Sequence, residues 1–462
     1  MQREYLINNP INTRLIIFFT GWSTDSKVVS NIELPEGYDF LVCWDYRSLN
    51  WINLKKEYEE TVIIAWSFGV AAANFLFNAI SENLNVTGLF GINGSTEPIE
   101  DKKGIPTEIF KSTKLTLNER NLKKFRIRTA GGIKNFASAE PLLETNLSVE
   151  DLIEELSCVE NLTLTSHQSP VWDCVFISTE DKIFPKENLE RAWVSTPIRI
   201  IVDGHHLPDF QSIFNLIIKD KNSICHNFQR QNLNYIDNAD VQNITAERLV
   251  QFLKKENRDF KNVLEIGSGA GNLTRLLYSA FLPQKLTLID LAEYNPISSA
   301  KKLEGDVECI LNSINNEQYD LIVSGSTLQW VHSPYRTLKR LKEELEKNGI
   351  LIISIFIEGT FKEINDINGH SLLYFTKEQW EEIVSKAGFE ILSSQLFNDK
   401  MEFDSVMEVL KHIRLTGVNS IGGKKKNIVE MKQLISRYPE IDGKIFLTYK
   451  SLILLLKKKE DN

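Results

Sequence analysis

The chain has 462 residues, 42% of them hydrophobic and 25% charged, which is the composition of a folded globular protein and excludes a disordered or fibrous one. This length exceeds what one hydrophobic core usually fills, so we expect two domains. A formal net charge of −9 argues against nucleic acid as the main partner, because binding to phosphate groups requires a basic face.

The cysteines and the apolar segments indicate the cellular setting. The five cysteines are odd in number, widely spaced and without a C-x-x-C pair, so we expect reduced thiols. The first residues lack the basic and apolar regions of a secretory signal. The longest apolar stretch, residues 62–80, contains four interrupting small or polar residues and indicates a buried strand followed by a packed helix. We therefore expect a cytoplasmic protein with no membrane association.

The first half of the chain alternates strand-like runs with helical segments, which predicts a mostly parallel α/β sheet. The expected strands cover residues 14–20, 40–44, 61–66, 86–92, 174–178 and 198–202. Between residues 93 and 170 the alternation gives way to polar and helical sequence. We interpret this segment as a lid inserted over an active site.

The α/β pattern restarts after Lys219-Asp220-Lys221-Asn222, which places a domain boundary near residue 222. The expected strands of the second half cover residues 262–266, 285–289, 319–324 and 349–355. The sequence thus predicts two α/β domains: residues 1–222, with the lid as an insertion, and residues 223–462, with a Rossmann-like order of strands and helices.

A candidate nucleophile follows the buried run at 62–64, in Ala65-Trp66-Ser67-Phe68-Gly69. A nucleophilic serine on a sharp strand-to-helix turn needs small residues two positions on either side, and Ala65 and Gly69 meet that need. Ala65 stands where glycine is usual. Ser67 is therefore the predicted nucleophile, although a serine in any tight turn of this kind would give the same local pattern.

The partners of such a serine are an acid and then a histidine, in that chain order. Asp181 follows the strand at 174–178, and His206 follows the strand at 198–202, where an α/β sheet presents its chemistry. Alternatives remain at both positions. Asp181 could cap a helix, with Asp173 and Glu180 as rival acids, and His205 could replace His206 as the base.

Two backbone amides are candidates for an oxyanion hole. One belongs to Phe68, next to the nucleophile, and the other to Trp22 in the loop Thr20-Gly21-Trp22-Ser23 after the first strand. Backbone donors at these places would stabilise a tetrahedral intermediate.

A glycine-rich loop, Glu265-Ile266-Gly267-Ser268-Gly269-Ala270-Gly271, follows the strand at 262–266 and predicts a nucleotide site. Asp290 closes the next strand, where a carboxylate can hold ribose hydroxyls, and Asp306 could meet an adenine amine. Either aspartate could instead cap a turn. The predicted cofactor-binding residues are Glu265, Gly267, Ser268, Gly269, Gly271, Asp290, Leu291, Asp306 and Ser324.

The glycine spacing alone fits both dinucleotide enzymes and methyltransferases. The strand from Tyr319 with Leu328-Gln329-Trp330 after it, and the turn at 346–351 with Asn348 in place of a glycine, resemble the class I S-adenosylmethionine-dependent methyltransferases. S-adenosyl-L-methionine is therefore the expected cofactor. The seven histidines show no metal-ligand spacing, so we expect no metal.

Each half also resembles a more specific family. Phe228, Tyr235 and the segments 241–244, 328–330 and 410–417 are similar to malonyl-acyl-carrier-protein O-methyltransferase of biotin synthesis, the BioC family. The segments 19–22, 65–69 and 206–208 are similar to the BioG type of pimeloyl-acyl-carrier-protein methyl ester esterase. The resemblance implies a bifunctional enzyme that makes a methyl ester on a malonyl group and later removes it from a pimeloyl group.

An acyl carrier protein carrying these groups is the implied partner, and it is acidic. Two basic segments could meet it: residues 111–128, with seven lysines and arginines against one acid, and Lys424-Lys425-Lys426. Such runs are more often solvated faces.

Arg414 is a weaker candidate for holding a substrate carboxylate. Since a carboxylate is already ionised at neutral pH, methyl transfer to it needs alignment more than a general base. His332 is a weak candidate for such a base.

Two other functions fit the same residues. The first half could be a general ester or thioester hydrolase fused to a small-molecule methyltransferase. It could also be a catalytically inactive module that docks a carrier for its neighbour.

Overall fold

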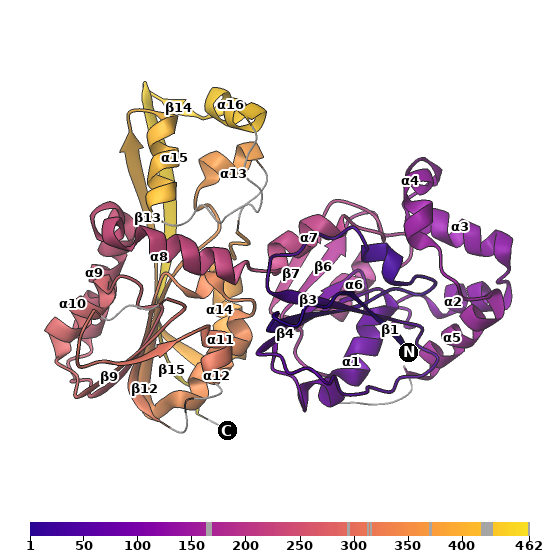
Figure 1. Ribbon diagram of the computed structural model, residues 1–462, viewed down its shortest axis with the longest axis horizontal. Coiled ribbons are helices and arrows are strands. Elements are labelled where there is room, and N and C mark those ends of the chain that lie inside the picture. Colours follow the sequence, from indigo (N-terminus) through magenta and orange to yellow (C-terminus); the bar gives the residue numbers. More distant parts are fainter. Residues whose placement is uncertain are drawn as a thin grey trace. The chain divides into compact units, whose positions relative to one another are not determined.

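A computed structural model describes the backbone of residues 1–162, 169–292, 296–311, 314, 317–368, 372–416 and 428–460. The described chain forms two compact units, Met1–Phe214 and Asn215–Asn462. The boundary expected near residue 222 falls at the start of helix α8 (Lys221–Asn238). Each unit has an α/β architecture with its own sheet (Figure 1).

The first unit contains a seven-stranded sheet in the order β1-β3-β2-β4-β5-β6-β7. Its strands are β1 (Gln2–Ile7), β2 (Arg14–Phe19), β3 (Tyr38–Trp44), β4 (Glu60–Trp66), β5 (Val86–Ile92), β6 (Cys174–Ser178) and β7 (Ile198–Val202). Strand β1 pairs antiparallel with β3, and the other neighbours are parallel. The central strands read as continuous apolar runs because helices cover both faces of the sheet.

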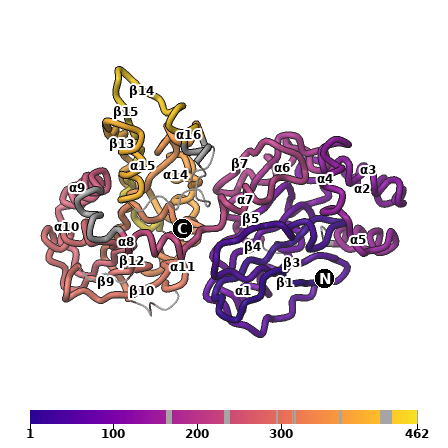
Figure 2. The backbone as a smooth tube through the Cα atoms, turned by 45° about the horizontal axis from the view of Figure 1, so that its top comes forward, coloured from indigo at the N-terminus to yellow at the C-terminus, as the bar shows by residue number. Residues whose placement is uncertain are grey.

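Four helices form an insertion between β5 and β6. They are α2 (Thr107–Leu115), α3 (Glu119–Thr129), α4 (Ile133–Leu143) and α5 (Val149–Leu162). They gather at one end of the unit in both views (Figures 1 and 2). The other helices of this unit, α1 (Phe68–Ser81), α6 (Lys186–Ala192) and α7 (Phe210–Ile217), follow β4, β6 and β7; α7 runs three residues past the unit boundary.

The second unit contains an eight-stranded sheet. Its main path runs β10-β9-β8-β11-β12-β15-β13, and β14 pairs with β15 at one side. The strands are β8 (Asn262–Ile266), β9 (Lys285–Asp290), β10 (Lys301–Glu304), β11 (Tyr319–Gly325), β12 (Leu345–Phe356), β13 (Phe389–Phe403), β14 (Glu440–Ile441) and β15 (Lys444–Lys458). Strands β8 to β12 are parallel, whereas β15 is antiparallel to both β12 and β13. This order is a Rossmann-like sheet with an antiparallel extension.

The helices of the second unit are α8, α9 (Asp240–Lys255), α10 (Asn272–Phe281), α11 (Val307–Ile310), α12 (Pro334–Glu344), α13 (Lys362–Asn368), α14 (Lys377–Lys386), α15 (Val406–Leu415) and α16 (Ile428–Arg437). The long strands β13 and β15 project beyond the parallel strands, where α15 and α16 accompany them (Figure 2). A separate apolar cluster there includes Phe356, Phe361, Val409, Leu447 and Tyr449.

Candidate active sites

Ser67 occupies a strained turn between β4 and α1. Its backbone has φ 59° and ψ −127°, a conformation that non-glycine residues rarely adopt. Gly69 allows the turn to pass close to β2, because a Cβ atom there would lie 2.4 Å from the carbonyl oxygen of Phe19. The close approach explains why glycine is required two residues after the serine.

His206 and Asp181 stand in line with Ser67. The His206 Nε2 atom lies 3.0 Å from Ser67 Oγ, and its Nδ1 atom lies 2.8 Å from Asp181 Oδ2. The side chains of His206 and Asp181 are 2% and 0% exposed, so the line is shielded from water. The other oxygen of Asp181 accepts the backbone N–H groups of Ile183 and Phe184, at 2.7 and 2.9 Å. These two bonds fix the orientation of the carboxylate.

The rival residues lie elsewhere. His205 is half-buried, with its ring against Gly131 and its Nδ1 atom 3.3 Å from the exposed carboxylate of Glu180. Asp173 accepts the backbone N–H of Leu89 at 2.7 Å and so joins β5 to the start of β6. Among these alternatives, only the set Ser67, Asp181 and His206 forms a continuous hydrogen-bonded line in the described chain.

A pocket of about 450 Å³ opens beside Ser67. Its lining is mostly apolar and comes from the loop after β2, the turn after β4, the insertion and the loop after β6: Trp22, Ser67, Phe68, Ile105, Ile109, Phe110, Thr113, Phe125, Arg128, Leu156, Lys182 and Ile183. No described residue accepts a hydrogen bond from the backbone N–H of Trp22 or of Phe68. These two donors are therefore available at the pocket.

The basic segment 111–128 divides into paired and unpaired cations. Lys114 and Lys123 form ion pairs with Glu160 and Glu140, at 2.7 and 3.2 Å. Burial lowers the pKa of Arg126, whose Nε atom has no hydrogen-bond partner among the described residues. Lys111, Arg120 and Lys124 are exposed. The other basic run, Lys424-Lys425-Lys426, lies outside the described residues, and Arg414 is exposed on α15.

The second unit has a cavity of about 1130 Å³, counting space open to solvent, at the carboxyl ends of its parallel strands. Six of the predicted cofactor residues line it: Gly267, Ser268, Gly269, Asp290, Leu291 and Asp306. Gly267 has a φ of 74°, and a Cβ atom there would lie 2.0 Å from Thr327 Oγ1. Only glycine lets the loop pass this close to the segment after β11.

Three predicted cofactor residues are not part of the lining. Gly271, with a φ of 85°, is the N-cap residue of α10. Ser324 is buried and donates its hydroxyl to the carbonyl oxygen of Ile266, at 3.3 Å, which joins β11 to β8. Glu265 precedes the lining residue Ile266 and is completely buried.

Two acidic residues at this cavity are held in different ways. Asp290 accepts the backbone N–H groups of Gly269 and Ala292, at 2.8 and 2.9 Å, and burial raises its pKa against the effect of these bonds. Asp306 accepts the N–H of Glu308 at 3.0 Å, and its other oxygen lies 2.8 Å from Lys221 Nζ. Asp306 is thus both a helix cap and part of a buried ion pair.

Lys221 belongs to a buried charged cluster that the sequence pattern did not reveal. Its ammonium also lies 3.0 Å from Glu308, whose carboxylate contacts His332 Nδ1 at 3.1 Å. Burial alone would raise the pKa of Glu308, but Lys221 and His332 hold it well below its usual range. His332 Nε2 accepts the N–H of Lys219 at 3.1 Å, so both of its ring nitrogens are engaged. The polar run around Lys221 predicted only a domain boundary.

The residues of this cavity fit a cationic cofactor. Neither carboxylate oxygen of Glu265 has a well-formed hydrogen bond among the described residues; burial raises its pKa to about 8, against the effect of the nearby Thr274 hydroxyl. A buried carboxyl without partners is costly unless a cation or a donor meets it. The amino group of S-adenosylmethionine would supply such a partner.

A smaller cavity of about 330 Å³ adjoins the first and shares Phe228, Gln242, Ser326 and Trp330 with it. Its remaining described lining is Gln329, Phe356, Phe361, Tyr374, Thr416 and Tyr449, so the described walls carry no charged residue. Of the segments that suggested a family, Phe228, Gln242, Gln329 and Trp330 face these cavities. The side chain of Tyr235 lies outside the described residues.

Sequence comparison supports a two-part enzyme. The family model of the pimeloyl-ACP methyl esterase BioG matches residues 2–215, and that of a methyltransferase domain matches residues 238–394. The fold of the second unit and its cavity at Gly267, Ser268 and Gly269 define the class. The protein is a Rossmann-like S-adenosylmethionine-dependent methyltransferase, joined to the α/β unit that precedes it.

The relatives identify the family. A malonyl-[acyl-carrier protein] O-methyltransferase of Bacteroides fragilis is 30% identical over 97% of this chain and 94% of its own length. The protein of the same name from Chlorobium phaeovibrioides is 32% identical and covers 53% of this chain and 98% of its own. The chain belongs to the malonyl-acyl-carrier-protein O-methyltransferase family of biotin synthesis, as a fusion of a BioG-type unit with a BioC-type unit.

Among solved structures, BioG from Haemophilus influenzae is 27% identical, with a TM-score of 0.41, and covers 45% of this chain and 94% of its own. A methyltransferase structure from Bacillus halodurans is 15% identical, with a TM-score of 0.36. In the described residues, no helix has the length and apolar character needed to cross a membrane.

Proposed function

We propose that this chain carries both activities of a methyl-ester protection step, and that it works in the cytoplasm. Its second unit would methylate the free carboxyl of malonyl-acyl-carrier protein. Its first unit, an α/β-hydrolase-like domain over residues 1–222 with residues 93–170 as a lid, would hydrolyse pimeloyl-acyl-carrier-protein methyl ester. The observation that carries the esterase proposal is the line from Ser67 through His206 to Asp181, at 3.0 and 2.8 Å.

In this mechanism His206 Nε2 accepts the Ser67 hydroxyl proton while Oγ attacks the ester carbonyl carbon. His206 Nδ1–H remains bonded to Asp181, which stabilises the imidazolium. The N–H groups of Trp22 and Phe68 would bind the oxyanion. Collapse of the tetrahedral intermediate breaks the bond to the methoxy oxygen, which takes the proton from His206 and leaves as methanol. A water molecule, activated by the same histidine, then releases the acid.

The methyltransferase unit needs mainly alignment. S-adenosylmethionine supplies an electrophilic methyl group when bound, and Glu265, Asp290 and the loop Gly267–Ser268–Gly269 would hold it. The acceptor carboxylate would enter the smaller cavity, where Gln242 and Ser326 stand at the junction with the cofactor cavity. The reaction neutralises two opposite charges, so uncharged walls favour the transition state over the ionised reactants.

Two variants test the two activities separately. Ser67→Ala should abolish ester hydrolysis and leave methyl transfer nearly unchanged, since the serine lies in a separate compact unit. Asp290→Ala should weaken cofactor binding by about 1.5–3 kcal/mol and leave hydrolysis unchanged. Asp290→Asn, which preserves the side-chain shape, would show how much of this loss comes from the carboxylate charge.

Labelling of the serine and a comparison of substrates separate the alternative functions of the first unit. A fluorophosphonate probe that labels the wild type but not Ser67→Ala would establish an active serine. Absence of labelling would favour a carrier-docking module. Equal hydrolysis of free and carrier-bound esters would favour a general hydrolase.

A further inference from the structure

Helix α5 of the insertion is attached to the loop that carries Trp22. The indole Nε1 of Trp22 donates a hydrogen bond to the backbone carbonyl oxygen of Leu152, in α5, at 3.1 Å. The Trp22 ring also meets the Phe125 ring of α3 edge-on, with centroids 4.8 Å apart. The position of Trp22, which lines the pocket, therefore depends on the insertion.

A second connection runs from α5 to the same loop through Tyr46. The carboxylate Oε1 of Glu155 accepts the backbone N–H of Tyr46 at 3.0 Å. The hydroxyl of Tyr46 donates to the carbonyl oxygen of Thr20 at 2.6 Å, two residues before Trp22. Glu155 and Tyr46 are each 1% exposed. The line Glu155–Tyr46–Thr20 is thus buried throughout.

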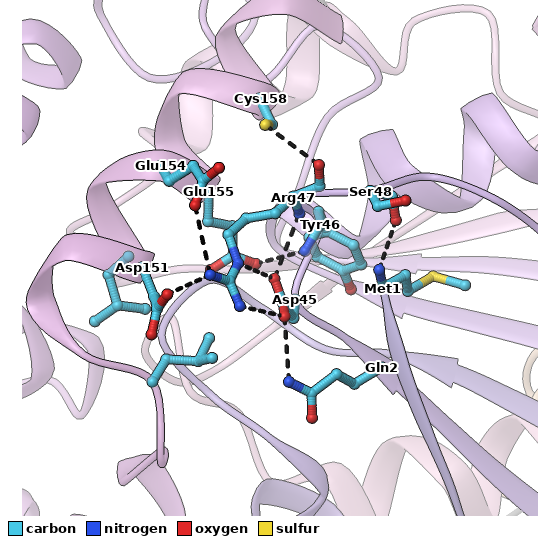
Figure 3. Close-up of polar contacts among 12 residues, drawn as sticks. Met1, Gln2, Asp45, Tyr46, Arg47, Ser48, Asp151, Glu154, Glu155 and Cys158 are labelled. Atoms are coloured by element: carbon cyan, nitrogen blue, oxygen red, sulfur yellow. Dashed lines mark hydrogen bonds and ion pairs between the residues drawn. The ribbon is translucent and has the colours of Figure 1, made fainter.

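The turn around Tyr46 is braced to present its N–H to α5. Asp45 has a φ of 61°, and its carboxylate receives Arg47 Nε and NH2, at 2.8 and 2.9 Å. Gln2 adds a bond to the same carboxylate at 3.2 Å. Arg47 also reaches Asp151 and Glu154 of α5, and Cys158 Sγ donates to the Arg47 carbonyl oxygen at 3.5 Å. Figure 3 shows that Asp151, Glu154, Glu155 and Cys158 approach this turn from one face of α5.

The charges around Glu155 leave it with one unpaired oxygen. Its Oε2 atom is buried and has no hydrogen-bond partner among the described residues. Burial raises the pKa of Glu155 to about 7 against the hydrogen bond from the Tyr46 N–H, which lowers it; the nearby Asp45 carboxylate raises it further, and Arg47 and the N-terminal ammonium lower it. On α5 itself the neighbouring ionisable groups are Asp151, Glu154 and Cys158. On the β3 side they are Asp45, Tyr46, Arg47 and Cys43.

We propose that Glu155 is a positioning residue of the ester-hydrolysing site. From α5 it holds Tyr46, and through the Tyr46 hydroxyl it holds the Thr20–Trp22 loop, whose N–H would bind the oxyanion. The inference rests on the proposed esterase function of Ser67. It also assigns α5 a structural role in the chemistry, beyond covering the pocket.

Burial favours the protonated form of Glu155, although the Tyr46 N–H makes the stronger hydrogen bond to the ionised carboxylate. The neutral carboxyl still accepts the Tyr46 N–H and leaves no uncompensated charge on Oε2. Because the folded-state pKa is raised above the usual carboxyl value, the stabilisation is complete at low pH and is lost as pH rises through about 7. The docking of α5 should therefore loosen above neutral pH.

The test compares Glu155→Leu and Glu155→Gln with a matched control, Glu154→Gln, on the same helix. Glu154 is 65% exposed in its side chain and contacts Arg47 only at 3.5 Å. Steady-state hydrolysis of a p-nitrophenyl ester by the full chain gives kcat and KM, and thermal unfolding of the same samples, followed at the transition that the cofactor does not shift, reports that the first unit is folded. Glu155→Leu should lower kcat about tenfold or more with KM changed less than twofold, as expected for a displaced oxyanion donor.

Glu155→Gln should restore kcat to within about threefold of the wild type, because its amide oxygen accepts the same N–H. The ratio of wild-type to Glu155→Gln activity should be constant below about pH 6 and fall above about pH 7, because only the wild type has an ionisable carboxyl at this position. Glu154→Gln should behave as the wild type at every pH. A kcat of Glu155→Leu equal to that of the wild type would overturn the proposal.

Tyr46→Phe provides the second variant if Glu155→Leu does not fold. It removes only the hydroxyl that holds Thr20, and it should lower kcat with KM unchanged; an unchanged kcat would again overturn the proposal. If the wild type neither hydrolyses esters nor labels Ser67 with a fluorophosphonate, the esterase function itself fails. That result is distinct from an active wild type with unaffected variants.

Discussion

The indole Nε1 of Trp66 donates a hydrogen bond to the backbone carbonyl oxygen of His206, at 2.8 Å. The residue before Ser67 in the sequence therefore holds the backbone of the residue that faces Ser67 in space. The two aromatic rings also lie against each other, with centroids 5.3 Å apart. Asn93 Nδ2 donates to the same carbonyl oxygen at 3.1 Å, so the histidine backbone is held from two strands.

Trp66→Phe should lower the kcat of ester hydrolysis about tenfold with little change in KM, because His206 would shift relative to Ser67. The lost bond should also reduce the free energy of unfolding of the first unit by about 1 kcal/mol. Trp172→Phe is the matched control, since Trp172 is equally buried but bonds to Asn74. Steady-state kinetics and thermal unfolding measure both effects. Equal kcat in the two variants would contradict this role of Trp66.

The parts of the fold that the sequence predicted are those with strong local patterns. Buried parallel strands are continuous apolar runs, and the strands expected at 174–178 and 198–202 coincide with β6 and β7. Strand β1 and the long strands β13 and β15 were not predicted. Strand β13 alternates exposed and half-buried positions with many polar residues, so its pairing with β15 depends on distant contacts.

The candidate sites show the same limit. The sequence placed Ser67, Asp181 and His206 at strand ends but could not choose between His205 and His206, because neighbouring residues share every local signal. Lys221 was missed altogether, since a buried ion pair with Asp306 leaves no trace in a short polar run. Phe136 belongs to the segment interpreted as a lid, but it packs under Lys123 and is not part of the pocket lining.

Glu265→Gln should change both stability and cofactor binding. The folded-state pKa of Glu265, about 8, lies above its ordinary value of 4.5, so its protonated form stabilises the fold and that stability is lost as pH rises from about 4.5 to 8. At pH 8.5 the variant should therefore unfold a few degrees above the wild type, whereas at pH 5 the two should be similar.

The same substitution removes the carboxylate proposed to meet the cofactor amino group. Affinity for S-adenosylmethionine should fall about tenfold or more at pH 8, as measured by calorimetry. The unfolding transition that the cofactor shifts identifies the second unit. Glu247→Gln, at an exposed site on α9, is the control. A pH-independent difference in unfolding temperature would be evidence against the raised pKa.

The exposed cations of the insertion provide a test of carrier docking. Reversing Arg120 and Lys124 to glutamate should raise KM for carrier-bound esters about tenfold, because an acidic partner loses electrostatic attraction. Small free esters should be unaffected. Lys114, Lys123 and Arg126 are better left intact, since they are ion-paired or buried.

A control with the same change in net charge is Lys55→Glu with Lys285→Glu, both exposed and outside the insertion. The effect of reversing Arg120 and Lys124 should decrease as the salt concentration rises, since exposed charges are screened. An equal loss on free and carrier-bound esters would mean that the segment is structural.

The last prediction concerns how one chain avoids hydrolysing the ester that it has just made. A malonyl methyl ester cleaved by the first unit would waste one cofactor in each cycle, so the esterase must discriminate by chain length. The pocket beside Ser67 offers apolar walls from Phe68, Phe110, Leu156 and Ile183. An apolar pocket gains about 0.8 kcal/mol per buried methylene, so the four additional methylenes of a pimeloyl chain could contribute about 3 kcal/mol, or about a hundredfold preference.

We therefore expect kcat/KM for the pimeloyl-carrier methyl ester to exceed that for the malonyl ester at least tenfold. Phe110→Ala should reduce this ratio, because Phe110 is 2% exposed and lines the pocket from α2, away from the line of Ser67, His206 and Asp181. Its effect on the malonyl ester should be smaller, since the shorter chain makes fewer contacts with the wall. Equal specificity constants for the two esters in the wild type would show that discrimination does not reside in this pocket, and that the separation of the two activities must come from the carrier or from the order of the pathway.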